Sequence, residues 1–156
     1  MAFVPGGNNH PQLYSCEDNK ALLRRYYDEV INKKNLAAID EFIDPNFVNH
    51  ALPPGMPAGI EGERQVFSMY TTAFPDTHFT VEDMITEGDR VVARLSVSAT
   101  QHGAYMGLPA TGKHVRFTGI DIIHLAGGKL VERWGEMDML GMLQQLGVVP
   151  LPEQAS

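Results

Sequence analysis

The feature that most constrains the fold of this chain is a change in the spacing of its apolar residues near residue 77. Before this point apolar side chains recur every three or four residues, as they do from Leu22 to Ile31, which is typical of an amphipathic helix. After it they alternate with polar side chains, most regularly over Arg90–Thr100, as in a half-buried strand. Helices followed by strands predict an α+β fold with a mostly antiparallel sheet.

Local signals set the expected limits of these elements. Ser15 and Asp18 resemble a capping box, which predicts the start of the first helix. The alternation slips near Asp83, which indicates a β-bulge. Further helices are expected over residues 36–43, 60–74 and 137–146, a short extended piece over 47–52, and strands over 77–87, 90–100, 115–125 and 129–136.

Length and composition predict one folded domain with two tails. A chain of 156 residues is long enough to bury a core without disulfides or metal. We expect a single domain over residues 15–150. Residues 1–14 contain prolines, glycines and asparagines, which are typical of a flexible tail, and residues 151–156 are expected to form a second tail. The first residues also lack the charged and apolar regions of a secretory signal.

The charge balance restricts the classes of partner. A formal net charge of −7 and a pI near 5.2 argue against nucleic acid or an anionic membrane, since both attract basic surfaces. No run of 18 apolar residues is present, so the sequence predicts no membrane span. The single cysteine, Cys16, excludes an internal disulfide and is typical of a reducing compartment. A cytoplasmic protein is the resulting expectation.

One carboxylate stands out on the strand predicted over residues 115–125. Alternate residues of a strand share a face, so Asp121 lies among apolar neighbours that run from Phe117 to Leu125. Desolvation raises the pKa of a carboxyl group, which suits a general acid or base near neutral pH. The alternative is a structural ion pair with a basic residue of a neighbouring strand, for which Arg94 is the leading candidate.

Four local strings stand in a characteristic order along the chain, namely Asp44–His50, Phe74–Asp76, Gly107–Lys113 and Gly128–Trp134. Together with the order of elements, they resemble the SnoaL-like polyketide cyclases, a family of the superfamily related to nuclear transport factor 2. The resemblance covers nearly all of the expected domain. It implies a cone-shaped, cystatin-like α+β fold, in which helices pack on the concave face of a curved sheet.

The resemblance also implies a reaction, the intramolecular aldol ring closure of a polyketide ester by an enzyme that needs neither metal nor organic cofactor. In the family the base that removes the proton next to a carbonyl group is an aspartate at the position of Gly135, and a histidine stands at the position of Asp121. Asp121 therefore acts as the base from the neighbouring strand, or the chain performs a related hydration, dehydration or isomerisation. A third possibility is a non-catalytic module that binds an apolar metabolite or serves in assembly.

Besides Asp121, the candidate catalytic residues are His50, before the proline-rich loop, and His102, at a strand end. A plain surface position is the alternative for each. The candidate substrate-binding residues are Asn49, Arg94, Met106, Phe117 and Trp134.

Each type of candidate substrate-binding residue could contact a ligand for a chemical reason, and each also has a purely structural explanation. Arg94 would neutralise an enolate if it does not pair with Asp121. Trp134, the only tryptophan, would stack on an aromatic ligand, although core packing explains it equally well. Methionines such as Met106 line adaptable pockets but also fill cores. The histidines show no metal-ligand spacing, so no metal site is expected.

The expected partners are an apolar or aromatic small molecule and further copies of the chain. Val92, Ser96 and Ser98 share one face of the strand over residues 90–100, and this face is mild in polarity. Such a face suits packing of one sheet against another, as the family resemblance also implies. We expect a homodimer or a homotetramer with two-fold symmetry.

Overall fold

The structure is a computed structural model that describes residues 14–153. Most of the predicted N-terminal tail, and the last three residues of the predicted C-terminal tail, lie outside the described residues. The helices are α1 (Cys16–Tyr26), α2 (Ile39–Phe42), α3 (Ile60–Ala73) and α4 (Met139–Leu146), with a π-helical turn at Tyr27–Asn32 and a 3-10 turn at Leu36–Ala38. The strands are β1 (Ile43–Asn49), β2 (His78–Glu87), β3 (Arg90–Thr100), β4 (His114–Ala126) and β5 (Lys129–Met137).

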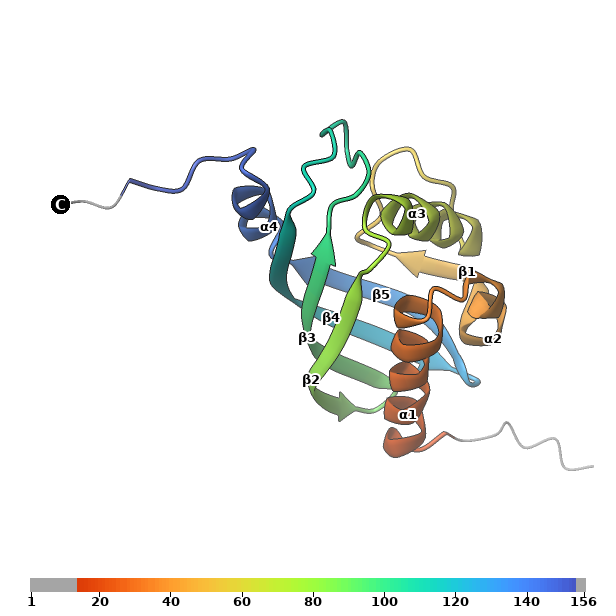
Figure 1. The fold of residues 1–156 in the computed structure, drawn as a ribbon. Coiled ribbons are helices and arrows are strands. Elements are labelled where there is room, and N and C mark those ends of the chain that lie inside the picture. The colour runs from red at the N-terminus through yellow and green to blue at the C-terminus, as the bar shows by residue number, and fades with distance from the viewer. Residues whose placement is uncertain (1–13, 154–156) are drawn as a thin grey trace, which may run out of the picture.

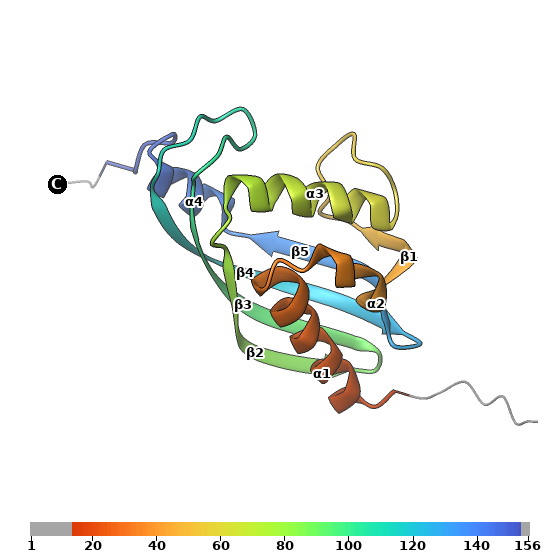
Figure 2. The same ribbon diagram turned by 45° about the vertical axis from the view of Figure 1, so that its right-hand side comes forward.

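The five strands form one curved sheet in the order β1-β5-β4-β3-β2. β1 runs parallel to β5, and the other neighbours are antiparallel. Helices α1, α2 and α3 lie on the concave face, while α4 covers one end of the sheet (Figures 1 and 2). The predicted α+β fold with a mostly antiparallel sheet is confirmed.

The concave face of the sheet, called the inner face below, carries most of the core. Alternate residues of β3 and β4 are buried on it, as the alternation in the sequence predicted. One apolar cluster joins α1 and α2 to the sheet around Leu23, Ile39 and Leu95. A second cluster, around Phe74 and Met142, lies under α4. The inner face is thus closed at its margins, which leaves room for a cavity between the helices and the middle of the sheet.

Several local predictions hold in detail. Ser15 caps α1 in a capping box, since its side chain accepts from Asp18 N and its own N–H donates to the Asp18 carboxylate, both at 3.0 Å. The pairing of β2 with β3 shifts between Val81 and Asp83, where the bulge was expected. No helix within residues 14–153 is long and apolar enough to cross a membrane.

The second helix and the extended piece differ from their predicted limits. The helix predicted over residues 36–43 ends at Phe42, and β1 begins at Ile43 instead of Phe47. Pro45 interrupts a helix but is tolerated here because β1 is an edge strand that pairs only with β5. The last helix begins at Met139, two residues later than predicted, because β5 continues to Met137 and Asp138 then caps α4.

Candidate functional site

A cavity of about 210 Å³ lies between the helices and the inner face of the sheet. Its wall is mostly apolar or aromatic and includes Phe67, Phe117 and Met137. Apart from tyrosines, four polar side chains line it: Asn49, Glu63, Asp121 and Arg133. An apolar cavity with a few converging polar groups is the usual form of a small-molecule site.

Asp121 forms the centre of the polar wall and is only 3% exposed. Its Oδ1 accepts from Arg133 Nε at 3.0 Å and from Arg133 Nη2 at 2.7 Å. Its Oδ2 accepts from the hydroxyl group of Tyr27 at 2.7 Å. Both carboxylate oxygens are therefore engaged, and the negative charge of Asp121 is balanced by a guanidinium.

The hydrogen bonds continue from Arg133 to α3. Arg133 Nη1 donates to Asn49 Oδ1 at 3.2 Å, and Asn49 Nδ2 donates to Glu63 Oε1. The relay, by which we mean Tyr27, Asp121, Arg133, Asn49 and Glu63, thus joins side chains from both sides of the cavity. Buried polar networks of this kind hold their members in fixed positions when every member has a partner.

Gly135 explains how Arg133 reaches Asp121. Gly135 pairs with Asp121 across β4 and β5, and Arg133 precedes it by two residues on the same face of β5. A Cβ atom at Gly135 would lie 2.2 Å from Arg133 Nη2 and 2.7 Å from Asp121 Oδ1. The guanidinium therefore occupies the space that a side chain at position 135 would fill.

Burial and the neighbouring charges shift the ionisation of the relay. Burial raises the pKa of Glu63, and the hydrogen bond from Asn49 only partly opposes this. Burial lowers the pKa of Arg133, but the adjacent Asp121 carboxylate outweighs that effect and the net shift is upward. Burial, followed by the charge of Asp121, raises the pKa of Tyr27, so its hydroxyl stays a donor. The result is one ion pair and one desolvated carboxyl group on the same wall.

Towards α4 the cavity wall is aromatic and rich in methionine. Tyr70 packs on Phe74 and Tyr105 with ring centroids 5.0 and 6.0 Å apart. Burial raises the pKa of Tyr70 to about 12, so this tyrosine is neutral at physiological pH. Met137, Met139 and Met142 also line this part. A flat, apolar ligand fits such surroundings.

Of the residues that the sequence singled out, Asp121, Asn49 and Phe117 line the cavity. Their roles in catalysis or binding stay predictions. The others, His50, His102, Arg94, Met106 and Trp134, do not line it.

Arg94 is not the partner of Asp121. In β3 it is Ala93 that pairs with Asp121, and Arg94 pairs with Ile120. Consecutive residues of a strand point to opposite faces, so Arg94 lies exposed on the outer face of the sheet. The ion-pair alternative was right in kind, but the arginine comes from β5.

Trp134 and His50 meet away from the cavity. Trp134 pairs with the exposed Ile122 on the outer face, where its ring stacks on His50 with centroids 4.9 Å apart. The Arg90 guanidinium lies 5.1 Å from the Trp134 ring centroid, and His50 Nε2 is 2.7 Å from Glu132 Oε1. The stacking partner of the indole is thus a residue of the chain itself.

The pairing of β4 with β5 explains why Trp134 is outside. Leu125 pairs with Leu130, but His124 pairs with Glu132, so Val131 is an extra residue that forms a bulge. Without it, regular alternation from Leu130 would direct Trp134 inward. With it, Arg133 and Gly135 take the inner positions.

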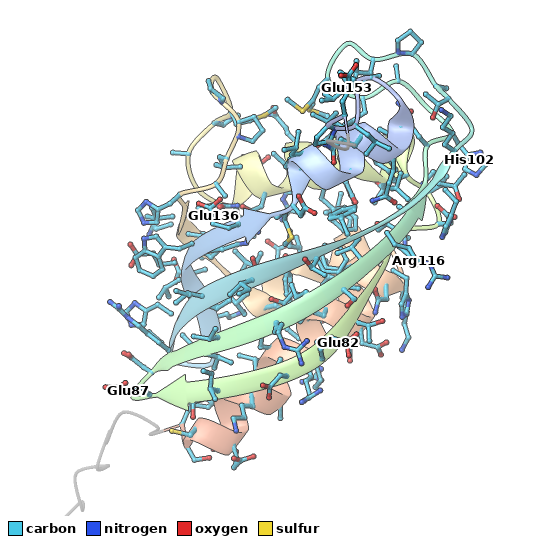
Figure 3. All side chains as sticks on the ribbon, turned by 90° about the vertical axis from the view of Figure 1, so that its left-hand side faces the viewer. Glu82, Glu87, His102, Arg116, Glu136 and Glu153 are labelled. Atoms are coloured by element: carbon cyan, nitrogen blue, oxygen red, sulfur yellow. The ribbon has the colours of Figure 1, made fainter. Side chains whose placement is uncertain are left out.

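His102 and Met106 belong to the segment between β3 and β4. His102 lies exposed at one end of the sheet (Figure 3), and its backbone N–H donates to Ala73 O at 2.9 Å. The Met106 side chain is 70% exposed. Tyr105, the residue before it, is the one that turns into the cavity.

Sequence reasoning missed Arg133, Glu63, Tyr26 and Tyr27. Arg133 lay inside a string that was used only for the family resemblance. Glu63 is in the first turn of α3, where acidic residues are common for reasons of helix stability, so it carried no separate signal. Within residues 14–153 no group of three or more histidine, cysteine or acidic side chains could hold a metal ion.

Comparison with known proteins places this chain in a family. The SnoaL-like polyketide cyclase family matches residues 21–146, and the chain belongs to this family. A search of curated proteins gives no match.

Solved structures agree with the family. TsrD from Streptomyces laurentii is 28% identical with a TM-score of 0.80, over 88% of this chain and 100% of that one. IdmH from Streptomyces antibioticus, provisionally named a polyketide cyclase, is 32% identical with a TM-score of 0.72, over 83% of this chain and 99% of that one. AclR from Streptomyces galilaeus, provisionally named a hydroxylase, is 28% identical with a TM-score of 0.77, over 89% and 91%.

Proposed function

We propose that this chain is an enzyme that performs cofactor-independent acid/base chemistry on a hydrophobic carbonyl compound. Aldol ring closure of a polyketide is the leading reaction, as the family and the name of IdmH suggest. The observation that carries the proposal is the relay on the wall of an otherwise apolar cavity. Burying ionisable groups costs stability, so a cluster of them beside a cavity favours a chemical role.

The proposed reaction needs a base and a donor for the oxygen that becomes negative. The base takes a proton from the carbon next to one carbonyl group, and the resulting enolate carbon attacks a second carbonyl group. Arg133 has five N–H donors, of which three are engaged with Asp121 and Asn49. The remaining donors suit a substrate oxygen that gains negative charge.

The sequence favoured Asp121 as the base. Because both of its oxygens accept hydrogen bonds, we instead assign it the positioning of Arg133 and Tyr27. A carboxylate held in this way keeps the guanidinium in one orientation, much as second-layer carboxylates orient other functional side chains.

Hydrogen–deuterium exchange tests the proposal without knowledge of the natural substrate. The protein is incubated in D2O with 1-indanone and with 2-tetralone, two flat bicyclic ketones, and NMR follows both ketone binding and the loss of protons beside the carbonyl group. We expect exchange faster than in buffer alone. Failure of both ketones to bind would contradict the proposed substrate class.

A non-catalytic binding module is the second candidate. Gly135 supplies no carboxylate, and Asp121 is tied in an ion pair, so the relay would then serve only to orient a ligand. Ketone binding without any exchange would establish this candidate and exclude the enzyme.

We further propose that the chain forms a homodimer through the outer face of the sheet, with a tetramer as the extended form. Ile85, Val92, Ile122 and Trp134 pair in succession across four strands and form an apolar row on this face. Figure 3 looks onto the same face, where Glu82 and Arg116 also lie. An exposed apolar row on a sheet is typical of a protein interface.

The single cysteine supports a cytoplasmic location.

A further inference from the structure

Glu63 is a carboxylate of the cavity that forms no ion pair with any residue in the range 14–153. It lies in the first turn of α3 and is buried. Its Oε1 accepts from Asn49, whereas its Oε2 has no hydrogen-bond partner within the same range. Among the buried and half-buried residues that the structure describes, every side-chain nitrogen or oxygen atom without solvent-accessible surface has a hydrogen-bond partner. Oε2 is therefore accessible, and Glu63 is one of the residues that line the cavity.

Tyr26 presents a second polar group without a partner. Its ring packs between Tyr27 and Phe42, with centroids 5.7 and 6.0 Å away, and it lines the same cavity. Its hydroxyl makes no hydrogen bond within the described part of the chain, so the hydroxyl oxygen also retains some accessible surface. Burial, followed by the nearby charge of Glu63, raises the pKa of Tyr26, which keeps the hydroxyl protonated. Two residues that carry an unengaged acceptor and an unengaged donor thus line one cavity from two helices.

We infer that Glu63 takes and returns the substrate proton, and that the Tyr26 hydroxyl donates to the carbonyl oxygen. This inference rests on the proposed function. The ionised Glu63 Oε2 removes a proton from the carbon beside the carbonyl group, and the C–H electron pair becomes the enolate double bond. The negative charge moves to the oxygen, where Tyr26 and Arg133 donate hydrogen bonds. The proton on Glu63 later returns to the product.

The groups around Glu63 explain why it suits this task better than Asp121. From β1 it meets the neutral Asn49, from β5 the charge of Arg133, and from β4 that of Asp121. Tyr26, the last residue of α1, and Tyr27, the first residue of the π-helical turn, line the same cavity. Arg133 is already neutralised by Asp121, so burial dominates and raises the pKa of Glu63 above its ordinary value of 4.5. A carboxylate with a raised pKa is a stronger base.

The exchange assay with 2-tetralone tests this assignment in four variants. Glu63→Gln keeps the shape of the side chain and an oxygen for Asn49, and Tyr26→Phe removes only the hydroxyl. Glu61→Gln is the matched control, because Glu61 lies in the same turn of α3 but is exposed. Asp121→Asn removes the other carboxylate of the cavity, so the contributions of Glu63 and Asp121 to the exchange rate can be told apart. We expect Glu63→Gln to lose about 100-fold or more in exchange rate while ketone binding is retained.

The pH profile distinguishes a proton carrier from a structural residue. In the wild type the rate should rise through the ionisation of Glu63, and this rise should be absent in Glu63→Gln. The control Glu61→Gln should match the wild type, and Tyr26→Phe should lower the rate without moving the profile. Exchange at the wild-type rate in Glu63→Gln would overturn the assignment. Exchange absent from the wild type itself, with ketone bound, would instead overturn the proposed function.

Discussion

The two faces of the sheet show opposite departures from the usual distribution of residues. The inner face, which should be apolar, buries the Asp121–Arg133 ion pair. The outer face, which should be polar, exposes Ile85, Ile120 and Ile122. The two departures meet in β4, where Asp121 lies between Ile120 and Ile122. The two proposals, chemistry inside and association outside, thus rest on side chains that alternate in direction along one sheet.

The largest change in stability is expected from breaking the ion pair between Asp121 and Arg133 on the inner face. Arg133→Met leaves the Asp121 charge buried without a counter-charge and should lower the free energy of unfolding by about 3 kcal/mol or more. The double variant Arg133→Met with Asp121→Asn should recover part of this loss. Urea unfolding of the single and double variants measures the coupling between the two sites.

Arg94→Met is the matched control for this experiment. Arg94 is exposed on the outer face, so its replacement should change stability by less than about 0.5 kcal/mol and should show no coupling to Asp121. Coupling of Asp121 to Arg94 in place of Arg133 would mean that Arg94, and not Arg133, is the ion-pair partner of Asp121 on the inner face.

A somewhat smaller effect is expected on the outer face. The wild type should sediment at about twice the chain mass of 17.2 kDa or more. Ile122→Lys places a charge in the apolar row and should weaken association by about 2 kcal/mol, or roughly thirtyfold. Leu140→Lys, at an exposed apolar position on α4, is the control and should leave association unchanged. A wild type that is monomeric at micromolar concentration would contradict the proposal that the outer face is an interface.

Gly135→Ala tests the space beside Asp121. The added Cβ must displace the Arg133 guanidinium, since it would otherwise lie 2.2 Å from Nη2. Overpacking of this kind should cost about 1.5 kcal/mol, which is less than loss of the ion pair because the end of an arginine can move. Thermal unfolding measures the change. An unchanged melting temperature would show that the guanidinium does not depend on a bare backbone at this position.

The smallest effect concerns the dependence of stability on pH. Burial raises the pKa of Glu63 above 4.5, so the folded state holds a proton that the unfolded state has already released. The contribution of Glu63 to stability is therefore complete below pH 4.5 and is lost as the pH rises through the raised pKa. Glu63→Gln should remove this part of the slope. A steeper decline in the variant would contradict the upward direction of the shift.

The sequence predicted the elements well because their signals are local. The limits of β3, the cap at Ser15 and the bulge at Asp83 depend on a few adjacent residues. The wall of the cavity depends on how distant segments pair. The bulge at Val131 reverses the facing of the residues that follow it, which places Arg133 inside and leaves Trp134, a predicted substrate-binding residue, outside.

The helices show the same limit. The π-helical turn that begins at Tyr27 alters the regular helical spacing just where Tyr26 and Tyr27 enter the cavity. Helical spacing placed both tyrosines among the apolar residues of the first helix, but it gave no sign that they would line a cavity. Asp121 was found because a carboxylate among apolar neighbours is visible in one strand alone.

The bulge at Val131 makes the chemistry of the cavity depend on chain length as well as on residue type. Deleting this single residue would restore regular alternation and turn β5 over from that point, so that Trp134 would face inward and Arg133 outward. An aromatic wall would replace a cationic one, although no side chain had been substituted. The fluorescence of Trp134, the only indole, should then shift to the blue as the ring is buried. An unchanged emission maximum would show that the strand absorbs the deletion elsewhere. Shortening the backbone by one residue is thus a route by which such a fold can change its ligand in one step.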